Sequence, residues 1–241
     1  MLAEHSALSV KAVPQTNTKA PDKLHIHPFS TFAVGAKIST LGAGLELATP
    51  LSRRLNLRAT ANYAIFNYAF NLDGINYDPR VDFRSAQIGV DWFPFHGGFH
   101  ISPGFLYFKN ALGGTANVPA GKTFSLEDTT YINSVDDPVS GTASLTYSRH
   151  MAPTLTFGWG NIIPRSGRHL SFPFEMGVAY TGAGSMNIKL AGTACTNQGC
   201  FNAATDPTTQ ANLQGEINDI NEEIKKVPIF PIISMGVAYR F

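Results

Sequence analysis

Apolar and polar residues alternate one by one along several stretches of the chain, and this period of two limits most strongly the folds open to it. Such alternation is typical of β-strands whose two faces meet different surroundings. The clearest run covers residues 169–190, and others cover 54–65, 86–92, 99–107, 154–159 and 231–241. The pattern predicts an all-β fold with one apolar and one polar face on each strand.

The composition indicates which surroundings the apolar faces meet. No stretch approaches the ~18 consecutive apolar residues of a membrane-spanning helix. The chain is only 15% charged, against ~25% in typical soluble domains. Strands can cross a bilayer only as a closed barrel, because every backbone group in lipid must be paired. We therefore predict a closed antiparallel up-and-down transmembrane β-barrel with its apolar faces outward. A soluble β-sandwich or lipocalin-like barrel, the rival fold, would turn them inward.

The strand count depends on residues 31–50. Six clear strands follow from residue 54, and a barrel with both ends on one side needs an even number. Within 31–50 the apolar phase changes from even positions, such as Val34 and Ile38, to odd ones, such as Leu45 and Leu47. A tight hairpin near residues 40–42 would explain the change and give eight strands, and a bulge in one long strand would also explain it. We predict eight.

The connections divide into short and long ones. Short connections fall near 50–54, 94–98 and 160–168, and longer ones at 72–79, 109–142 and 185–228. This arrangement is typical of outer-membrane barrels, whose long loops lie outside the cell.

The chain before the first strand differs from the rest. Residues 1–30 are polar and contain three prolines, so we expect a disordered or periplasmic lead-in before a barrel at 31–241. The first five residues contain neither a basic nor an apolar signal region. We expect that a signal peptide is missing from this sequence or has been removed.

One segment has a helical period instead. Asp206 can cap a helix and Pro207 suits its first position. An apolar residue then recurs at helical spacing, at positions Leu213, Ile217, Ile220 and Ile224. This predicts a short amphipathic helix at 207–226 in the last long loop. Its apolar stripe could pack on the barrel rim, rest on lipid headgroups or plug the mouth.

The chain ends in an alternating strand that stops on an aromatic residue. Ser234, Gly236, Tyr239 and Phe241 resemble the C-terminal signal of outer-membrane proteins: a polar residue, a glycine, an aromatic residue and a terminal phenylalanine. The resemblance implies that the barrel-assembly machinery reads this strand. Stretches 40–46, 73–78 and 91–95 also make 31–241 similar to small bacterial barrels of the OmpA/OmpW-like class. That resemblance implies a bacterial outer-membrane location, with lipid bilayer and lipopolysaccharide as surroundings, and no particular reaction.

The polar faces place several charged residues inside the predicted barrel. An eight-stranded barrel is just wide enough for side chains to fill, and an unpaired buried charge costs several kcal/mol. We therefore predict a paired lumen network. A narrow or gated polar pathway is the alternative. The lumen set is Glu46, Arg58, Asp91, His100, Glu175 and Arg240.

Two further groups of residues have expected roles at the edges of the barrel. Aromatic residues near the predicted periplasmic turns suit an interfacial girdle. Cys195 and Cys200 lie in a predicted external loop, where an exported chain with two cysteines forms a disulfide, and we expect no metal there. The girdle set is Trp92, Phe93, Phe95, Trp159 and Phe172.

Three hypotheses for function remain. The first is a structural or surface-interaction barrel whose loops 109–142 and 185–228 meet an unknown extracellular ligand. The second is a small porin or transporter. The third, a lipid-modifying enzyme, has only Ser148 and His150 as candidates, and no known catalytic signature is present. We predict no enzyme and no cofactor, and a net charge of +1 gives no reason to expect nucleic acid.

Overall fold

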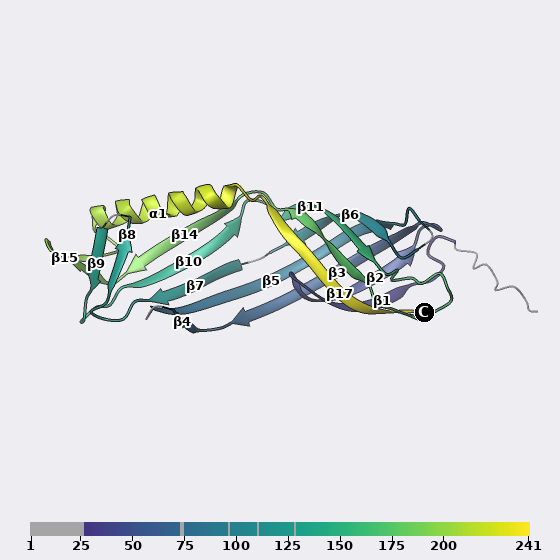
Figure 1. Ribbon diagram of the computed structural model, residues 1–241, viewed down its shortest axis with the longest axis horizontal. Coiled ribbons are helices and arrows are strands. Elements are labelled where there is room, and N and C mark those ends of the chain that lie inside the picture. Colours follow the sequence, from purple (N-terminus) through teal and green to yellow (C-terminus); the bar gives the residue numbers. More distant parts are fainter. Residues whose placement is uncertain (1–26, 73–74, 96, 110, 128) are drawn as a thin grey trace, which may run out of the picture.

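The computed structural model describes residues 27–72, 75–95, 97–109, 111–127 and 129–241. The predicted lead-in falls outside the described residues except for 27–30. The molecule is elongated, with a closed barrel at one end and an extension of strands and a helix at the other (Figure 1). The first and last strands pair with each other in the barrel.

Eight antiparallel strands close the barrel, each hydrogen-bonded to two neighbours, and the last pairs with the first. This confirms the predicted closed antiparallel barrel and its strand count. In spatial order the strands are β1 (Ala33–Ser39), β2 (Gly42–Pro50), β3 (Leu55–Asn67), β5 (Ile75–Trp92), β6 (His100–Phe108), β11 (Met151–Trp159), β13 (Phe174–Tyr180) and β17 (Ile229–Arg240).

A tight hairpin joins β1 to β2. Ser39 pairs with Gly42, and the Ser39 hydroxyl accepts from the Leu41 amide at 3.1 Å while donating to the Gly42 carbonyl at 3.0 Å. Gly42 has φ +104°, a value that favours glycine. The phase change within 31–50 is therefore a hairpin, and the alternative of one long bulged strand is wrong.

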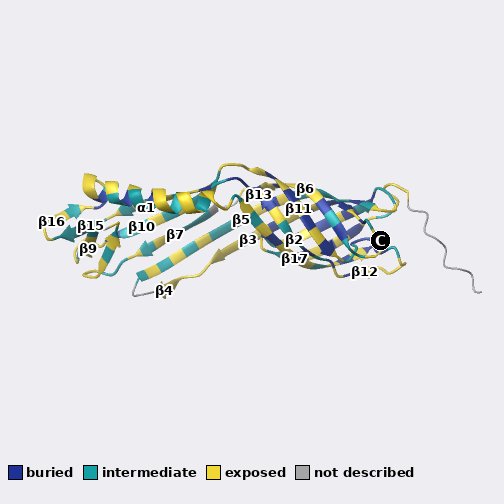
Figure 2. Ribbon diagram, turned by 45° about the horizontal axis from the view of Figure 1, so that its top comes forward, coloured by how far each residue is buried: buried dark blue, intermediate teal, exposed yellow. Residues whose placement is uncertain are grey.

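Exposed and buried residues alternate along the barrel strands (Figure 2). On β1, Val34 and Ile38 face outward, whereas Lys37 between them is buried and faces the lumen. The outward residues form a wide apolar belt, which is far too large for a water-facing surface. The belt therefore faces hydrocarbon, as in a transmembrane barrel. It includes Leu45, Leu47, Ile88, Phe105, Leu155, Phe157, Ile233, Met235 and Val237.

The extension is built from segments predicted as loops, and that expectation is wrong for most of 72–79, 109–142 and 185–228. The first half of β5 leaves the barrel and pairs with a three-strand continuation in the order β7, β10, β14, while a short strand, β4, pairs with β5. A second sheet forms the tip. The added strands are β4 (Phe70–Leu72), β7 (Ala111–Asn117), β10 (Ser140–Tyr147) and β14 (Gly184–Ala191), with β8 (Thr123–Leu126), β9 (Thr129–Asn133), β15 (Thr193–Thr196) and β16 (Gly199–Asn202) at the tip.

The long alternating run at 169–190 is not one strand. It begins with a two-residue strand, β12 (Leu170–Ser171), and then divides into β13 in the barrel and β14 in the extension. The break lies at 181–183, where Gly182 has φ +74°. Apolar alternation continues across this break because both parts have one apolar face, although the two faces meet different surroundings.

The predicted helix is present as α1 (Pro207–Lys225), capped by the Asp206 carboxylate, which accepts from the Thr209 amide. Leu213 and Ile217 are buried. Asn221 accepts from the amide of Met186 on β14 and donates to its carbonyl. The helix therefore packs on the extension, and the placement on the barrel rim is wrong. Among the described residues, no helix is both long enough and apolar enough to cross a membrane.

Candidate functional site

A buried network of charged side chains lies in the barrel lumen, centred on Arg58 of β3. One guanidinium nitrogen lies 2.8 Å from Oδ1 of Asp91. The other contacts Oε1 of Glu175 directly and lies 3.8 Å from Oε2 of Glu46. All four side chains are at most 5% exposed. One cation thus contacts carboxylates from three other strands, β2, β5 and β13.

Three more lumen residues complete the contacts of these carboxylates. Lys37 Nζ lies 3.7 Å from Glu46, and His100 Nε2 lies 2.9 Å from Glu175. The Ser102 hydroxyl donates to Asp91 at 2.7 Å. Sequence analysis missed Lys37, although its position was readable: it lies on the face of β1 opposite the apolar residues. The structure brings five of the six predicted lumen residues together in this network.

Glycines on the lumen side leave room for two of the carboxylates. A Cβ atom added at Gly35 would lie 2.8 Å from Cγ of Glu46, and one at Gly158 would lie 2.8 Å from Cγ of Glu175. Heavy atoms do not approach so closely without displacement. Each glycine therefore makes room for the glutamate directly opposite it on the neighbouring strand.

Asp91, His100 and Glu175 could together suit a metal ion, because one ligand atom of each lies within 4.8 Å of the others. Arg58, however, already contacts both carboxylates. A bound cation would then lie beside a buried guanidinium, which carries the same sign of charge. We therefore assign the three residues to the ion-pair network, in which each buried charge has an opposite partner, as buried charges require.

The segment 160–169 between β11 and β12, here called the lower plug, closes one end of the lumen. Ile162 and Ile163 are buried against alanines of the barrel wall. Asn56 donates to the side chain of Asn161 at 2.9 Å, and Arg240 donates to the Pro164 carbonyl at 2.7 Å. Arg240, predicted in the lumen network, instead holds this plug.

The opposite end of the lumen is closed by an apolar group, here called the Leu41 cluster. It comprises Leu41, Leu106, Phe108, Ala152, Ala179 and Ile232. Leu41 lies at the tip of the β1–β2 hairpin, where its side chain is 1% exposed. Tyr147 and Phe230 pack against the cluster from the side of the extension. The ion-pair network thus lies in a barrel that is closed at both ends by packed apolar side chains.

Four of the five predicted girdle residues are exposed at the lower-plug end of the barrel, namely Trp92, Phe95, Trp159 and Phe172. Phe93 is not among them, and its prediction is wrong: it is 3% exposed. Its ring packs against His100, with 5.2 Å between centroids, and under the Arg165 guanidinium. Because Trp92 at the end of β5 points outward, the next residue points inward.

The C-terminal strand closes the barrel between β1 and β13. Ser234 is buried, whereas Tyr239 and Phe241 face outward. A Cβ atom at Gly236 would lie 2.6 Å from the Ala36 carbonyl oxygen, so the residue permits a close approach of the two strands. The rings of Phe32 and Phe241 stack with 4.9 Å between their centroids. The residue before β1 therefore lies beside the residue after β17.

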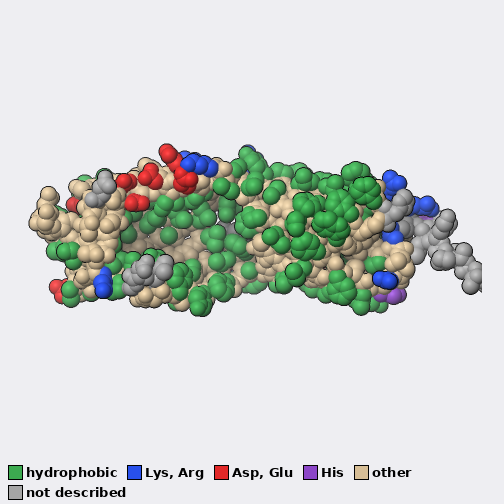
Figure 3. Space-filling model, in the orientation of Figure 1, with side chains coloured by type: hydrophobic (Ala, Val, Ile, Leu, Met, Phe, Trp, Pro, Cys, Tyr) green, Lys and Arg blue, Asp and Glu red, His purple; other side chains and the backbone are tan. Residues whose placement is uncertain are grey.

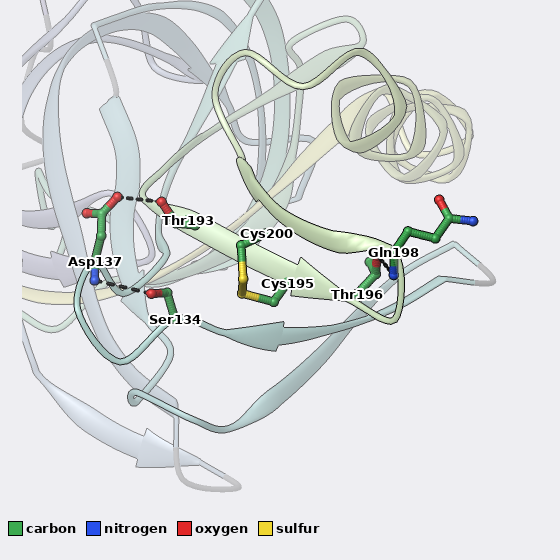
Figure 4. The surroundings of a disulfide bond; sticks show 7 residues. All are labelled: Ser134, Asp137, Thr193, Cys195, Thr196, Gln198 and Cys200. Carbon is green, nitrogen blue, oxygen red and sulfur yellow. Dashed lines mark hydrogen bonds between the residues drawn. A yellow bond between two sulfur atoms is a disulfide. The ribbon is translucent and has the colours of Figure 1, made fainter.

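The tip of the extension carries the predicted disulfide, which the structure confirms. Cys195 and Cys200 face each other across β15 and β16 (Figure 4). Beside it, the Thr193 hydroxyl donates to Asp137 at 2.7 Å and the Asp137 amide donates to Ser134 at 3.4 Å. These bonds join the tip to the loop before β10. Ser148 and His150, the enzyme candidates, are both exposed in the turn between β10 and β11.

Together these features define a class of protein. A closed eight-stranded antiparallel barrel has a lipid-facing apolar belt, and its two longest connections, after β6 and after β13, both lie at the end opposite the start of β1 and the end of β17. The chain is therefore a small bacterial outer-membrane β-barrel.

Solved structures give particular proteins for comparison. The chain is similar to CarO of Acinetobacter baumannii, with 21% identity, a TM-score of 0.62, and coverage of 89% of this chain and 98% of that one. CarO2 of Acinetobacter baumannii matches with 18% identity and the same TM-score over 89% of this chain and all of that one. At these identities the likeness shows a shared fold. No protein-family profile and no curated protein sequence matches the chain.

Proposed function

We propose that this protein is a closed outer-membrane barrel that anchors an extracellular binding unit and does not serve as a diffusion pore. The observation that carries the proposal is the filled lumen. Between the lower plug and the Leu41 cluster, the ion-pair network of Arg58 joins four barrel strands. An eight-stranded barrel filled by its own side chains leaves no aqueous channel.

The extension supports the second half of the proposal. It contains a continuation of the barrel sheet, a separate four-stranded sheet, a capped helix and a disulfide. Such order is far greater than loops joining barrel strands require, and rigid extracellular elements are suited to present a binding surface. The proposed role involves no catalysis. It includes contact with lipopolysaccharide around the belt and reading of the C-terminal strand by the assembly machinery.

Conductance in planar bilayers tests the proposal. The purified full chain is expected to give no reproducible unitary current in symmetric salt. A steady unitary current would overturn the closed-barrel role and favour the small porin.

Two variants would locate the path of such a current. Arg58→Ala removes the centre of the lumen network, whereas Ile233→Ala changes only the lipid-facing belt. A pathway through the lumen would respond to the first and not to the second. Liposome swelling with small solutes, measured on the same samples, reports on uncharged permeants that carry no current.

A further inference from the structure

The extension contains an apolar trough on the face of its sheet that continues the lumen face of the barrel. It is lined mainly by residues of β5, β7, β10 and β14 and has a volume of about 660 Å³. The strand register places the lining residues in rows across the sheet. Val81 pairs with Leu112, Leu112 with Leu145, and Leu145 with Met186.

The shape of the trough is linear. In the next two rows the central strands carry only small residues, Gly114 and Ala116 on β7 and Gly141 and Ala143 on β10. Larger side chains flank them on both sides, from β5 and from β14. These small residues form a floor two rows long. The trough itself runs along the strands, and over the seven residues of β7 it is about 20 Å long, at ~3.3 Å per residue.

The chemistry of the trough is uniformly apolar. Its lining contains hydrophobic residues, glycines, a serine and a threonine, and no charged side chain. Leu112 and Leu145 line the part of the trough toward the barrel, and Phe124 and Leu126 of β8 line the part at the tip. In Figure 3 hydrophobic side chains gather in the hollow beneath α1. A polar ligand would find almost no partner here.

Membrane lipid does not cover this region, because the opposite face of the same sheet is polar. Asn76, Asp78 and Arg80 on β5 and Asn187 and Lys189 on β14 are exposed on it. A sheet with such an outer face stands in water. The trough is thus an apolar site outside the bilayer, with its side chains only partly buried.

We infer that the trough binds a free single-chain amphiphile, such as a fatty acid, with its unbranched alkyl chain along the floor of small residues. An extended alkyl chain advances ~1.3 Å per carbon, given C–C bonds of about 1.5 Å, so about 15 carbons span the length of the trough. This inference rests on the proposed function, because it names the ligand of the extracellular unit.

Direct binding of radiolabelled palmitic acid to the full chain, held in amphipol and free of detergent, tests the inference. Wild type should bind saturably. Ala143→Leu places a larger side chain on the floor and should weaken binding by about tenfold or more, because the ligand must then displace it. The matched control is Thr142→Leu, which places the same side chain on the outer face of the same strand. It should remain within about twofold of wild type.

A chain-length series on wild type provides a readout that needs no variant. Each added methylene should tighten binding about fourfold until about 15 carbons, after which the gain should stop. A diazirine at the chain end should crosslink residues of β7 and β10. Equal binding by both leucine variants, crosslinks confined to the lipid-facing belt, or protection of the trough by a second copy of the chain would each overturn the inference.

Different experimental results would overturn the two proposals. A unitary current through the lumen would overturn the closed barrel and leave trough binding intact. A silent barrel without trough-specific binding would overturn the inference alone.

Discussion

The strand β5 belongs to both the barrel and the extension, and the polarity of its two faces is opposite in the two regions. In its barrel half the inward residues are polar, such as Ser85 and Asp91, and the outward Ile88 is apolar. In its first half the inward residues are apolar, such as Tyr77, and the outward Asp78 is polar. The strand is continuous, and odd-numbered residues face inward throughout.

The comparison shows that β5 keeps the same alternation of its side chains on both sides of the membrane surface. Only the surroundings of its outward face change, from water to hydrocarbon. Near residues 83–85 the polarity of the two faces of β5 exchanges, as expected where a strand passes from water into hydrocarbon. The barrel half is sealed by the lipid-facing belt and can hold ion pairs within. In the extension half the apolar face has to be shielded from water, and this face lines the trough.

The largest expected effect comes from removing the central cation of the lumen. Arg58→Met leaves Asp91 and Glu175 buried without their main partner, which should destabilise the barrel by about 3–5 kcal/mol. Urea unfolding in lipid vesicles measures this. Arg84→Met is the matched control in the same barrel, because Arg84 pairs with Asp82 at an exposed site, and it should leave the midpoint unchanged.

A combined variant sharpens this test. Adding Asp91→Asn and Glu175→Gln to Arg58→Met removes the uncompensated charges and should recover a large part of the loss. Equal midpoints for Arg58→Met and Arg84→Met would show that the lumen is hydrated enough to screen its charges.

The next largest effect is expected when an arginine is placed on the outward face of the barrel instead of the outward face of the extension. Leu45 lies on the belt and is 66% exposed. Leu45→Arg should cost about 2–4 kcal/mol, because it places a charge in the hydrocarbon. Thr142→Arg, on the outward face of the extension, should change stability by less than about 0.5 kcal/mol. Similar values for the two, from the same vesicle unfolding, would mean that the extension also lies in lipid.

Sequence patterns were sufficient to predict the barrel itself, because its signals are local. Alternation marked the barrel strands, and the phase change near Thr40 marked the hairpin. Asp206 and Pro207 marked the start of α1, and the two cysteines are close neighbours in the sequence. Each of these features depends on a few consecutive residues, which short-range geometry fixes.

Most of the extension was missed because its strands lack a strand pattern of their own, and β14 is the exception, since it lies within the alternating run at 169–190. β7 consists mainly of small residues, so its apolar face has almost no contrast with its polar one. The first half of β5 contains Asn76, Asp78, Pro79 and Arg80, a composition typical of turns. These segments become strands only because they continue an existing sheet.

Sequence patterns predicted which face of each strand the site residues occupy, but not which residues they contact. The alternation along each strand placed Glu46, Arg58 and Asp91 inside the barrel. It could not say which carboxylates Arg58 contacts. It also gave no sign that Arg240 holds the lower plug. The burial of Ile162 in the lumen depends on how a short connection folds back, which no periodic pattern encodes.

A smaller and strictly local effect is expected at the disulfide. The ring closed by Cys195 and Cys200 spans a sequence separation of 5, so a loss of about 2 kcal/mol at most is expected, confined to the tip. After reduction, or in Cys195→Ser/Cys200→Ser, proteolysis within 193–205 should become faster. The heat-dependent gel mobility of the folded barrel should stay as in wild type. A change in that mobility would mean that barrel and extension fold as one unit.

The smallest effect concerns the first turn of α1. The amide and hydroxyl of Thr209 donate to the Asp206 carboxylate and lower its pKa below the ordinary value of 3.8. The cap therefore stabilises the helix fully above that value and loses its effect as the pH falls through the lowered pKa of the folded state. Hydrogen exchange should show reduced protection of the Thr209 amide in Asp206→Ala at neutral pH, with the difference from wild type vanishing in strong acid. Asp219→Ala, in the exposed middle of the same helix, should keep wild-type protection, and an equal loss in both variants would assign the effect to helix charge rather than to the cap.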